Sequence, residues 1–337
     1  MKWGCFMKEK MLAFMMYLGE NQWGDCPTRP NSNGLAFCPE LHCDKKVWRE
    51  IAREAVKHGF NTVFIPTVDG VKYKSHPEIA VKGAWEVEEL KEELRYLREI
   101  GLTPIPELNF STAHDAWLGK YSRMVSTPIY YKVVRDLIHE VIDIFDQPEL
   151  FMLDMDEENH MVQVMLDFVC YRQHDLLWHD IKFLLDCVRE KGVRPWMYCD
   201  WFVKHPEKFM EVAGKDVVVS PWYYGPLYED TETKLPRLGD PADPDNYNEF
   251  LLAKIASFTS LPENGYDIIP VCSNCYNPYN VDHTIRYCVE NVPSDKLRGI
   301  AIAPWNGNTT EKNKFGFFSA FVAAKEAIEK YTEGGKL

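Results

Sequence analysis

Apolar stretches of strand length alternate with amphipathic helical stretches along almost the whole chain. The apolar stretches are nearly continuous, which is typical of parallel strands that are buried on both faces. The pattern predicts eight strands: Met11–Tyr17, Asn61–Pro66, Thr103–Leu108, Leu150–Met155, Arg194–Cys199, Val217–Pro221, Ile268–Ser273 and Ile300–Ala303. The helical stretches are Lys45–His58, Val87–Ile100, Tyr130–Phe145, His174–Lys191, Asn248–Leu261, Asp282–Val289 and Phe315–Tyr331.

This alternation predicts an α/β fold, a single (β/α)8 barrel with its active site at the C-terminal ends of the strands. The whole chain, residues 1–337, is expected to form one catalytic domain, with barrel strands from about residue 11 to 303 and a closing helix over 315–331. A doubly wound open sheet is the alternative. It is disfavoured because no G-x-G-x-x-G sequence follows the first strand.

The net charge of −13 disfavours nucleic acid and anionic membranes as partners. The ten cysteines are spread through predicted strands and helices, which indicates free thiols rather than a disulfide framework. The run Met11–Leu18 is interpreted as the first strand, because no small-residue cleavage site follows it, and the protein is expected in the cytoplasm. A homo-oligomer remains open.

The predicted strands end in carboxylates, amides and aromatic rings, with hardly any Lys or Arg. That mixture suits a neutral sugar better than a phosphorylated substrate, since sugars offer hydroxyl groups and C–H faces. The residues selected as substrate-binding are His114, Trp201, Trp222, Tyr224, Asn274, Tyr276, Tyr279, Trp305 and Asn306. Glu20, Asn21, Gln22 and Trp23 follow the first strand, and Asn109 follows the third.

A dense carboxylate cluster, Asp154–Glu158, directly follows the apolar Phe151–Leu153. Glycosidic cleavage needs a carboxylic acid to protonate the leaving oxygen and a second group to stabilise the positive centre. Crowded like charges raise at least one pKa, which suits such an acid. Asp156 and Glu157 are the predicted catalytic pair, and Asp154, Asp200 and Glu107 are possible additional carboxylates.

Two of these segments resemble motifs of the family 20 glycoside hydrolases, the β-N-acetylhexosaminidases. Gly101–His114 is similar to the third-strand motif of that family, and Phe151–Glu157 is similar to its fourth-strand motif. Trp222 and Trp305 are similar to the aromatic residues around its terminal sugar. The resemblance implies a barrel that hydrolyses terminal N-acetylhexosamine without a metal or other cofactor.

The resemblance also implies roles. The acetamido oxygen of the substrate attacks the anomeric carbon in this family. Glu157 would be the general acid and base, and Asp156 would orient the acetamido group. Tyr276 or Tyr279 would hydrogen-bond its oxygen, and His114 would support the site. Adjacent strand residues point to opposite faces, so Asp156 and Glu157 can share a site only where the strand ends and the chain turns.

The sequence departs from the family pattern at two places. Asp154-Met155 stands where the family has Gly-Gly, and the first-strand Arg of the family has no match between Met11 and Glu20. Two alternatives therefore stay open: a related barrel glycosidase that acts on a sugar without an acetamido group, and a sugar-binding barrel without catalysis. A metal-dependent hydrolase is disfavoured, because the first strand lacks the H-x-H pair.

Overall fold

A computed structural model describes residues 10–30, 36–228, 249–305 and 308–332. Its main sheet has nine parallel strands in the order β10-β11-β1-β2-β5-β6-β7-β8-β9. These strands are β1 (Met11–Met15), β2 (Thr62–Pro66), β5 (Thr103–Glu107), β6 (Leu150–Met152), β7 (Arg194–Tyr198), β8 (Val218–Ser220), β9 (Asp267–Ile268), β10 (Val271–Cys272) and β11 (Gly299–Ile302). The prediction of an α/β fold with parallel strands is confirmed.

The sheet curls around its own core. Phe64 on β2 packs against Trp196 on β7 with their ring centroids 5.4 Å apart, although β5 and β6 lie between these strands in the sheet. The indole N–H of Trp196 donates to the Ser220 hydroxyl at 2.7 Å, so a polar group inside the curl is satisfied. The core inside the curl is therefore filled by side chains from non-adjacent strands.

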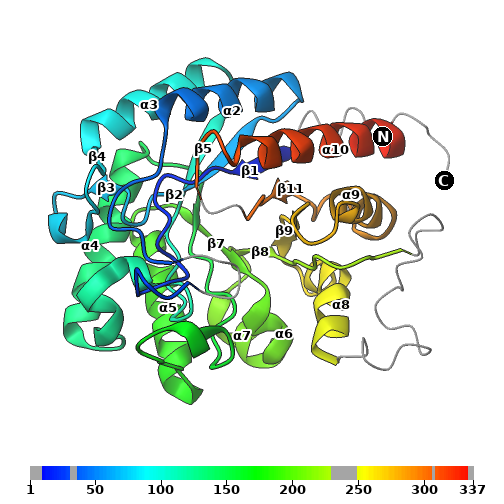
Figure 1. Ribbon diagram of the computed structural model, residues 1–337. Coiled ribbons are helices and arrows are strands. Elements are labelled where there is room, and N and C mark those ends of the chain that lie inside the picture. Colours follow the sequence, from blue (N-terminus) through cyan, green and yellow to red (C-terminus); the bar gives the residue numbers. More distant parts are fainter. Residues whose placement is uncertain (1–9, 31–35, 229–248, 306–307, 333–337) are drawn as a thin grey trace.

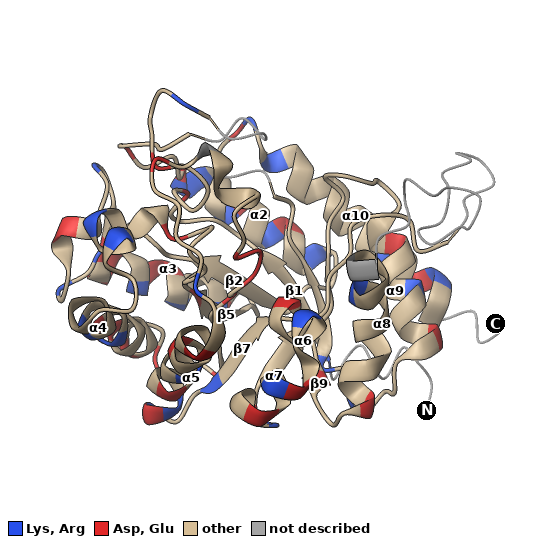
Figure 2. Cartoon of the chain, turned by 90° about the horizontal axis from the view of Figure 1, so that it is seen from below, with Lys and Arg blue, Asp and Glu red and all other residues tan. Residues whose placement is uncertain are grey.

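Helices lie around the outside of the sheet, and many of the positions occupied by charged residues lie on these helices (Figures 1 and 2). The described helices are α2 (Lys45–Lys57), α3 (Val87–Glu99), α4 (Pro128–Ile144), α5 (His174–Glu190), α6 (Asp200–Lys204), α7 (Pro206–Ala213), α8 (Glu249–Glu263), α9 (Asn280–Asn291) and α10 (Lys314–Thr332). In the part of the chain described, none of them has both the length and the apolar character needed to cross a membrane.

Three local features differ from the predicted elements. β6 ends at Met152 rather than Met155, because the backbone turns directly after it. The predicted seventh strand is divided into β9 and β10, with Pro270 between them, and proline has no N–H for a ladder. The sequence pattern did not predict α6 and α7, which follow β7 and are separated by His205.

The connection from β2 to α3 folds into a small structure of its own. It contains the paired strands β3 (Val71–Lys72) and β4 (Trp85–Glu86) and the 3-10 helix η1 (Pro77–Ile79). Two further 3-10 helices, η2 (Ala116–Met124) and η3 (Val162–Met165), lie in the connections after β5 and β6. The long connections thus gather at the ends of the strands that carry the predicted site.

Candidate active site

The chain turns sharply at the C-terminal end of β6. Asp154, Met155 and Glu157 have positive φ values of 56°, 60° and 51°. This left-handed turn brings Asp156 and Glu157 onto one side. The His114 Nε2 atom lies 3.5 Å from Asp156 Oδ2 and 3.4 Å from Glu157 Oε2. The geometric condition for a shared site is therefore met.

The left-handed region is also where the family motif has Gly-Gly. A residue with a Cβ atom is disfavoured there by roughly 1–2 kcal/mol, while glycine is not. Asp154 and Met155 adopt the same type of backbone that glycines would favour, and both side chains are buried. The substitution therefore keeps the turn and adds a buried carboxyl group beside the pair.

His114 lies between the two acidic side chains as a positive charge. Burial alone would lower its pKa, but the carboxylates of Asp156 and Glu157 outweigh burial and raise the pKa well above its usual value. Burial would raise the pKa of Asp156, yet His114 and the Asn109 amide hold it below the usual value. The Asn109 Nδ2 atom donates to Asp156 Oδ1 at 3.0 Å. Asp156 is thus fixed as a charged carboxylate.

The two acidic residues differ in access. The Asp156 side chain is 11% exposed and Glu157 is 36% exposed. The backbone N–H of Glu157 donates to Asp200 Oδ1 at 3.3 Å, which fixes the main chain while the carboxyl group reaches outward. Asp156 is therefore suited to hold a charge in place, and Glu157 is suited to exchange protons with a ligand.

A second carboxyl pair, Glu107 at the end of β5 and Asp154, lies deeper. Both are about 1% exposed. Burial, and then the charge of Asp156, raise the pKa of Glu107 to about 8. Burial and the neighbouring Glu107 raise the pKa of Asp154 well above its usual value. A raised pKa favours the protonated, neutral form of both groups, whereas the two-carboxylate alternative requires a charged nucleophile.

Aromatic rings from several strand ends gather in one cluster that reaches His114. Trp222 and Tyr224 follow β8 and stack with centroids 5.0 Å apart, and Tyr276 stacks on Tyr224 at 5.8 Å. Trp305, after β11, meets Tyr224 edge-on at 6.0 Å and Trp23 at 6.3 Å. We call these five residues the aromatic cluster. Trp23 also contacts His114 at 6.1 Å, which joins the cluster to the acidic pair.

The Tyr224 hydroxyl lies within electrostatic reach of both acidic residues. Burial, followed by the charges of Asp156 and Glu157, raises the pKa of Tyr224 well above its usual value. The hydroxyl therefore remains a proton donor throughout the physiological range. It is a further candidate for the tyrosine that the family resemblance assigns to Tyr276 or Tyr279.

Asp200 is engaged in support rather than exposed for catalysis. It is 1% exposed and accepts from the Trp222 indole N–H at 2.8 Å and from the Lys254 ammonium at 3.3 Å. The Lys254 ammonium also lies over the Trp222 ring. Asp200 therefore fixes Trp222 and the main chain of Glu157, and its carboxylate is already neutralised by an ion pair.

A buried arginine anchors the connection that follows the acidic pair. Arg172 donates to Glu158 from both Nε, at 2.9 Å, and Nη2, at 2.6 Å, and pairs with Asp180 on α5 at 3.3 Å. Glu158 also accepts from the backbone N–H of Thr112, which ties this connection to the one carrying His114. All three charged side chains are about 1% exposed or less. This network sets the position of His114 relative to Glu157.

Three predicted substrate-binding residues have other surroundings. Trp201 is 1% exposed and stacks on His205, so no open ring face remains for a sugar. Asn274 uses its amide N–H groups on Gly316 O and the Ser319 hydroxyl of α10. Tyr279 lies by a cavity of about 580 Å³ together with His283. Asn306 lies outside the described residues.

The structure adds residues that sequence reasoning did not select. Trp23 and Asn109 were noted among the strand-end residues, but only the folded chain brings them to His114 and Asp156. Tyr17, two residues after β1, and Tyr198, the last residue of β7, are buried, and burial with nearby carboxyl groups, including Asp154 and Glu107, raises the pKa of both. Their positions inside predicted apolar strands gave no signal of proximity to the site.

Two groups of described residues have ligand atoms close enough to hold a metal ion. One is His114, Asp156 and Glu157, and the other is Glu20, Cys38 and His42. The prediction that the catalytic site works without a metal stays a prediction.

No family model matches the sequence, and no curated protein matches it significantly. The family 20 exo-β-N-acetylglucosaminidase of Vibrio harveyi superposes with a TM-score of 0.63 at 16% identity, over 95% of this chain and 54% of that chain. The Bacteroides fragilis β-N-acetylhexosaminidase superposes with a TM-score of 0.61 at 14% identity, over 93% of this chain and 65% of that chain. Dispersin B superposes with a TM-score of 0.58 at 14% identity, over 96% of this chain and 100% of that chain.

The chain thus spans about half the length of the Vibrio enzyme and the full length of dispersin B. Sequence identities of 14–16% establish similarity of fold but not of chemistry. The segments that resemble the family motifs, at β5 and β6, end at the same acidic cluster in three dimensions. The protein has a fold like that of the glycoside hydrolase family 20 β-N-acetylhexosaminidases.

Proposed function

We propose that the protein is a retaining glycoside hydrolase that removes terminal N-acetylhexosamine by substrate-assisted catalysis. The observation that carries this proposal is the joint contact of His114 Nε2 with Asp156 and Glu157, at 3.5 and 3.4 Å. This contact supports a site in which the fixed carboxylate of Asp156 lies beside the accessible carboxyl group of Glu157. Substrate-assisted hydrolysis needs this division of roles and no second nucleophile from the protein.

In the first step the acetamido oxygen of the sugar attacks the anomeric carbon, and the bond to the leaving oxygen breaks. Glu157 gives its proton to that oxygen, and Asp156 accepts a hydrogen bond from the acetamido N–H and stabilises the positive oxazolinium ion. In the second step Glu157 takes a proton from water. The water oxygen attacks the anomeric carbon, which opens the oxazolinium ring and restores the acetamido group. Two inversions give retention.

The surroundings of the pair support these roles. Asp156 keeps its charge, because His114 and Asn109 lower its pKa. The protonated Tyr224 hydroxyl near both carboxylates is a suitable donor to the acetamido oxygen. The aromatic cluster offers ring faces to the C–H surfaces of a sugar.

The proposal includes closure of the sheet into the (β/α)8 barrel typical of such enzymes. β9 and β10 act in it as two halves of one strand. On one side Ile269 N donates to Val219 O at 3.2 Å, and Val271 N donates to Pro221 O at 3.0 Å. On the other side Ala301 N donates to Pro270 O at 2.9 Å. Both neighbours of a seventh barrel strand are thereby engaged, although the proline interrupts the ladder.

The test is hydrolysis of aryl glycosides of β-GlcNAc, β-GalNAc, β-glucose and β-galactose by the wild type and by Glu157→Gln, with the exposed Glu207→Gln on α7 as a matched control. We expect cleavage of the N-acetyl sugars only, and a loss of roughly 10²–10⁴-fold in kcat/KM for Glu157→Gln. The loss should shrink for leaving groups that need no protonation, because Glu157 then has no acid role in the first step.

Cleavage of a plain hexoside would reject substrate assistance in favour of the two-carboxylate alternative. Absence of cleavage, together with measurable binding of N-acetylglucosamine, would favour the sugar-binding barrel. Equal activity of Glu157→Gln and Glu207→Gln would remove Glu157 from the mechanism.

A further inference from the structure

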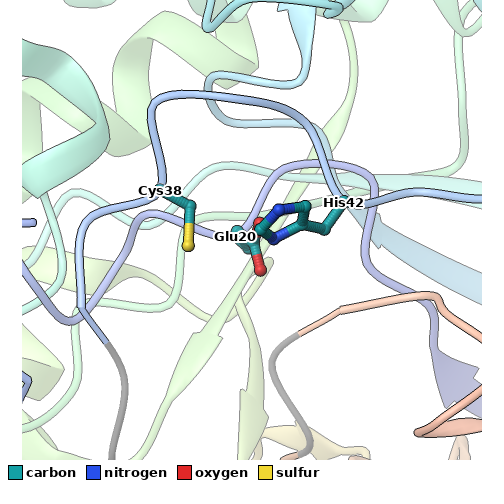
Figure 3. Close-up of side chains that lie close together, drawn as sticks. All are labelled: Glu20, Cys38 and His42. Atoms are coloured by element: carbon teal, nitrogen blue, oxygen red, sulfur yellow. The ribbon is translucent and has the colours of Figure 1, made fainter.

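We propose that Glu20, Cys38 and His42 form a binding site for a divalent transition metal of the zinc type. The three residues belong to the connection between β1 and α2 and lie outside the acidic pair that carries the proposed hydrolysis. Figure 3 shows their side chains gathered in one place, with Glu20 between Cys38 and His42. No step of the proposed hydrolysis uses them.

The donor atoms are close enough to share one ion. One ligand atom from each residue lies within 4.8 Å of the other two, and His42 Nδ1 is 2.8 Å from Glu20 Oε1. In tetrahedral zinc sites the metal–ligand distances are about 2.0–2.3 Å, which separates ligand atoms by roughly 3.3–3.8 Å. Shifts of less than about 1 Å therefore convert the present arrangement into a coordinating one, with the metal in place of the proton between His42 and Glu20.

The surrounding bonds hold two of the ligands in position. Asn308 Nδ2 donates to Glu20 Oε2 at 3.0 Å, which leaves Oε1 directed at His42. Asn21 accepts from the Cys38 backbone N–H at 2.6 Å and donates to the Cys38 carbonyl at 2.7 Å. Because Asn21 directly follows Glu20 in the chain, this pair of bonds fixes Cys38 beside Glu20. Such outer contacts are the usual means of orienting metal ligands.

The segment that carries His42 is also attached. Leu41 N donates to Lys82 O at 2.9 Å, and Lys82 N donates to Pro39 O at 3.0 Å. The backbone on either side of Glu40 is therefore tied to the connection between β3 and β4. His42 follows directly, and its half-exposed side chain is the most exposed of the three ligands. Its exposure leaves room for a water molecule as the fourth ligand.

The donor set identifies the class of metal. A thiolate, an imidazole and a carboxylate together favour Zn²⁺ and related ions, whereas Mg²⁺ and Ca²⁺ favour oxygen atoms alone. The group His114, Asp156 and Glu157 contains no sulfur. Thiolate coordination therefore distinguishes the site at Glu20 from any metal bound at the acidic pair.

A metal here would fasten the connection that carries Trp23, three residues after Glu20, to the segment 38–42. Trp23 contacts both His114 and Trp305. The site is thus a structural clamp beside the aromatic cluster. This role concerns loop position and does not depend on which reaction the acidic pair performs.

The test is titration of the chelator-treated full chain with Co²⁺ and Zn²⁺. We expect one equivalent of Co²⁺ to produce a thiolate-to-cobalt charge-transfer band, which Zn²⁺ abolishes by displacement. Cys38→Ser should lose the band, and Glu20→Gln and His42→Ala should weaken Zn²⁺ binding by at least about tenfold. Cys26→Ser is the matched control, because Cys26 lies in the same connection but outside the group.

Circular dichroism of the metal-free variants verifies that each is folded. If a substitution at one of the more buried positions prevents folding, His42→Ala still tests the site, because His42 is exposed. A charge-transfer band that survives Cys38→Ser, an equal loss in Cys26→Ser, or no thiolate band in the wild type would overturn the proposal. None of these readouts requires hydrolytic activity, so the outcome is separate from that of the proposed function.

Discussion

Burial raises the pKa of several carboxyl groups of this protein. Asp69 and Asp115 are buried acids whose pKa values burial raises to about 7 and about 8. Glu107 and Asp154 belong to the same class, whereas Asp156 keeps a low pKa because His114 and Asn109 compensate its burial. Charge is thus retained at the one acid for which the proposed mechanism needs it.

This difference predicts that stability depends on pH through Glu107. Its pKa rises from 4.5 when unfolded to about 8 when folded, so the folded state binds the extra proton between these values. The free energy of unfolding should therefore fall as the pH rises from about 4.5 to 8. In Glu107→Gln this fall should be smaller. Urea unfolding at pH 5, 7 and 9 measures it.

Asp69 and Asp115 also lower the free energy of unfolding as the pH rises, but they do so equally in wild type and variant. The difference between the two proteins therefore isolates the contribution of the pair Glu107 and Asp154. Glu107→Gln combined with Asp154→Asn should flatten the dependence further, since Asp154 also has a raised pKa. Identical pH dependences in wild type and variant would show that Glu107 ionises alike in the folded and unfolded states.

At the scale of elements, the connections after β5 and β6 hold the site together through buried charge. Arg172 joins Glu158, Asp180 on α5 and the Phe110 carbonyl, to which it donates at 2.8 Å. Removal of one partner of a buried ion pair leaves an uncompensated charge, while removal of both partners often costs little. The network therefore holds the two connections in a fixed arrangement, because loss of any one of its charges leaves another buried charge without a partner.

We expect Arg172→Met to lower the free energy of unfolding by about 3–5 kcal/mol, because Glu158 and Asp180 are left buried without their cation. Urea unfolding at pH 7 measures the loss. Arg95→Met is the control, since Arg95 is an exposed residue on α3. Addition of Glu158→Leu to Arg172→Met should recover part of the loss, and strict additivity of the two substitutions would contradict the network.

At the scale of the whole molecule, the curl of the sheet brings the ends of distant strands together. Trp23 follows β1, Tyr224 follows β8, Tyr276 follows β10 and Trp305 follows β11, yet their rings touch. Trp305 has a φ of 36°, an unusual conformation for a tryptophan, which its neighbours must stabilise. The cluster is therefore a product of the curled arrangement of the sheet rather than of any one segment.

If the cluster binds the sugar, Trp305→Ala should raise the KM for an aryl N-acetylglucosaminide by a factor of roughly 2 to 13, which corresponds to the loss of about 0.5–1.5 kcal/mol of ring contact. The change in kcat should be smaller. Phe315→Ala is the matched control, because that ring is 68% exposed and lies at the start of α10. Steady-state kinetics separates the two constants. A fall in kcat at constant KM would point instead to a positioning role.

The sequence by itself determined the alternation of strands and helices and the place of the acidic segment Asp154–Glu158 after the fourth strand. These are local signals, since each rests on the periodicity of neighbouring residues or on one short motif. The same signals indicated Asp156, Glu157, His114, Trp222 and Trp305, and the structure brings these residues together.

Only the tertiary structure decided how the candidates are used. Lys254 neutralises Asp200 from 54 positions away, Trp201 is buried on His205, Tyr279 lies by another cavity, and Trp23 joins His114. The left-handed turn that unites Asp156 and Glu157 occurs at residues that disfavour it. Such contacts depend on which distant segments pack together, and one-dimensional patterns carry no information about those distances.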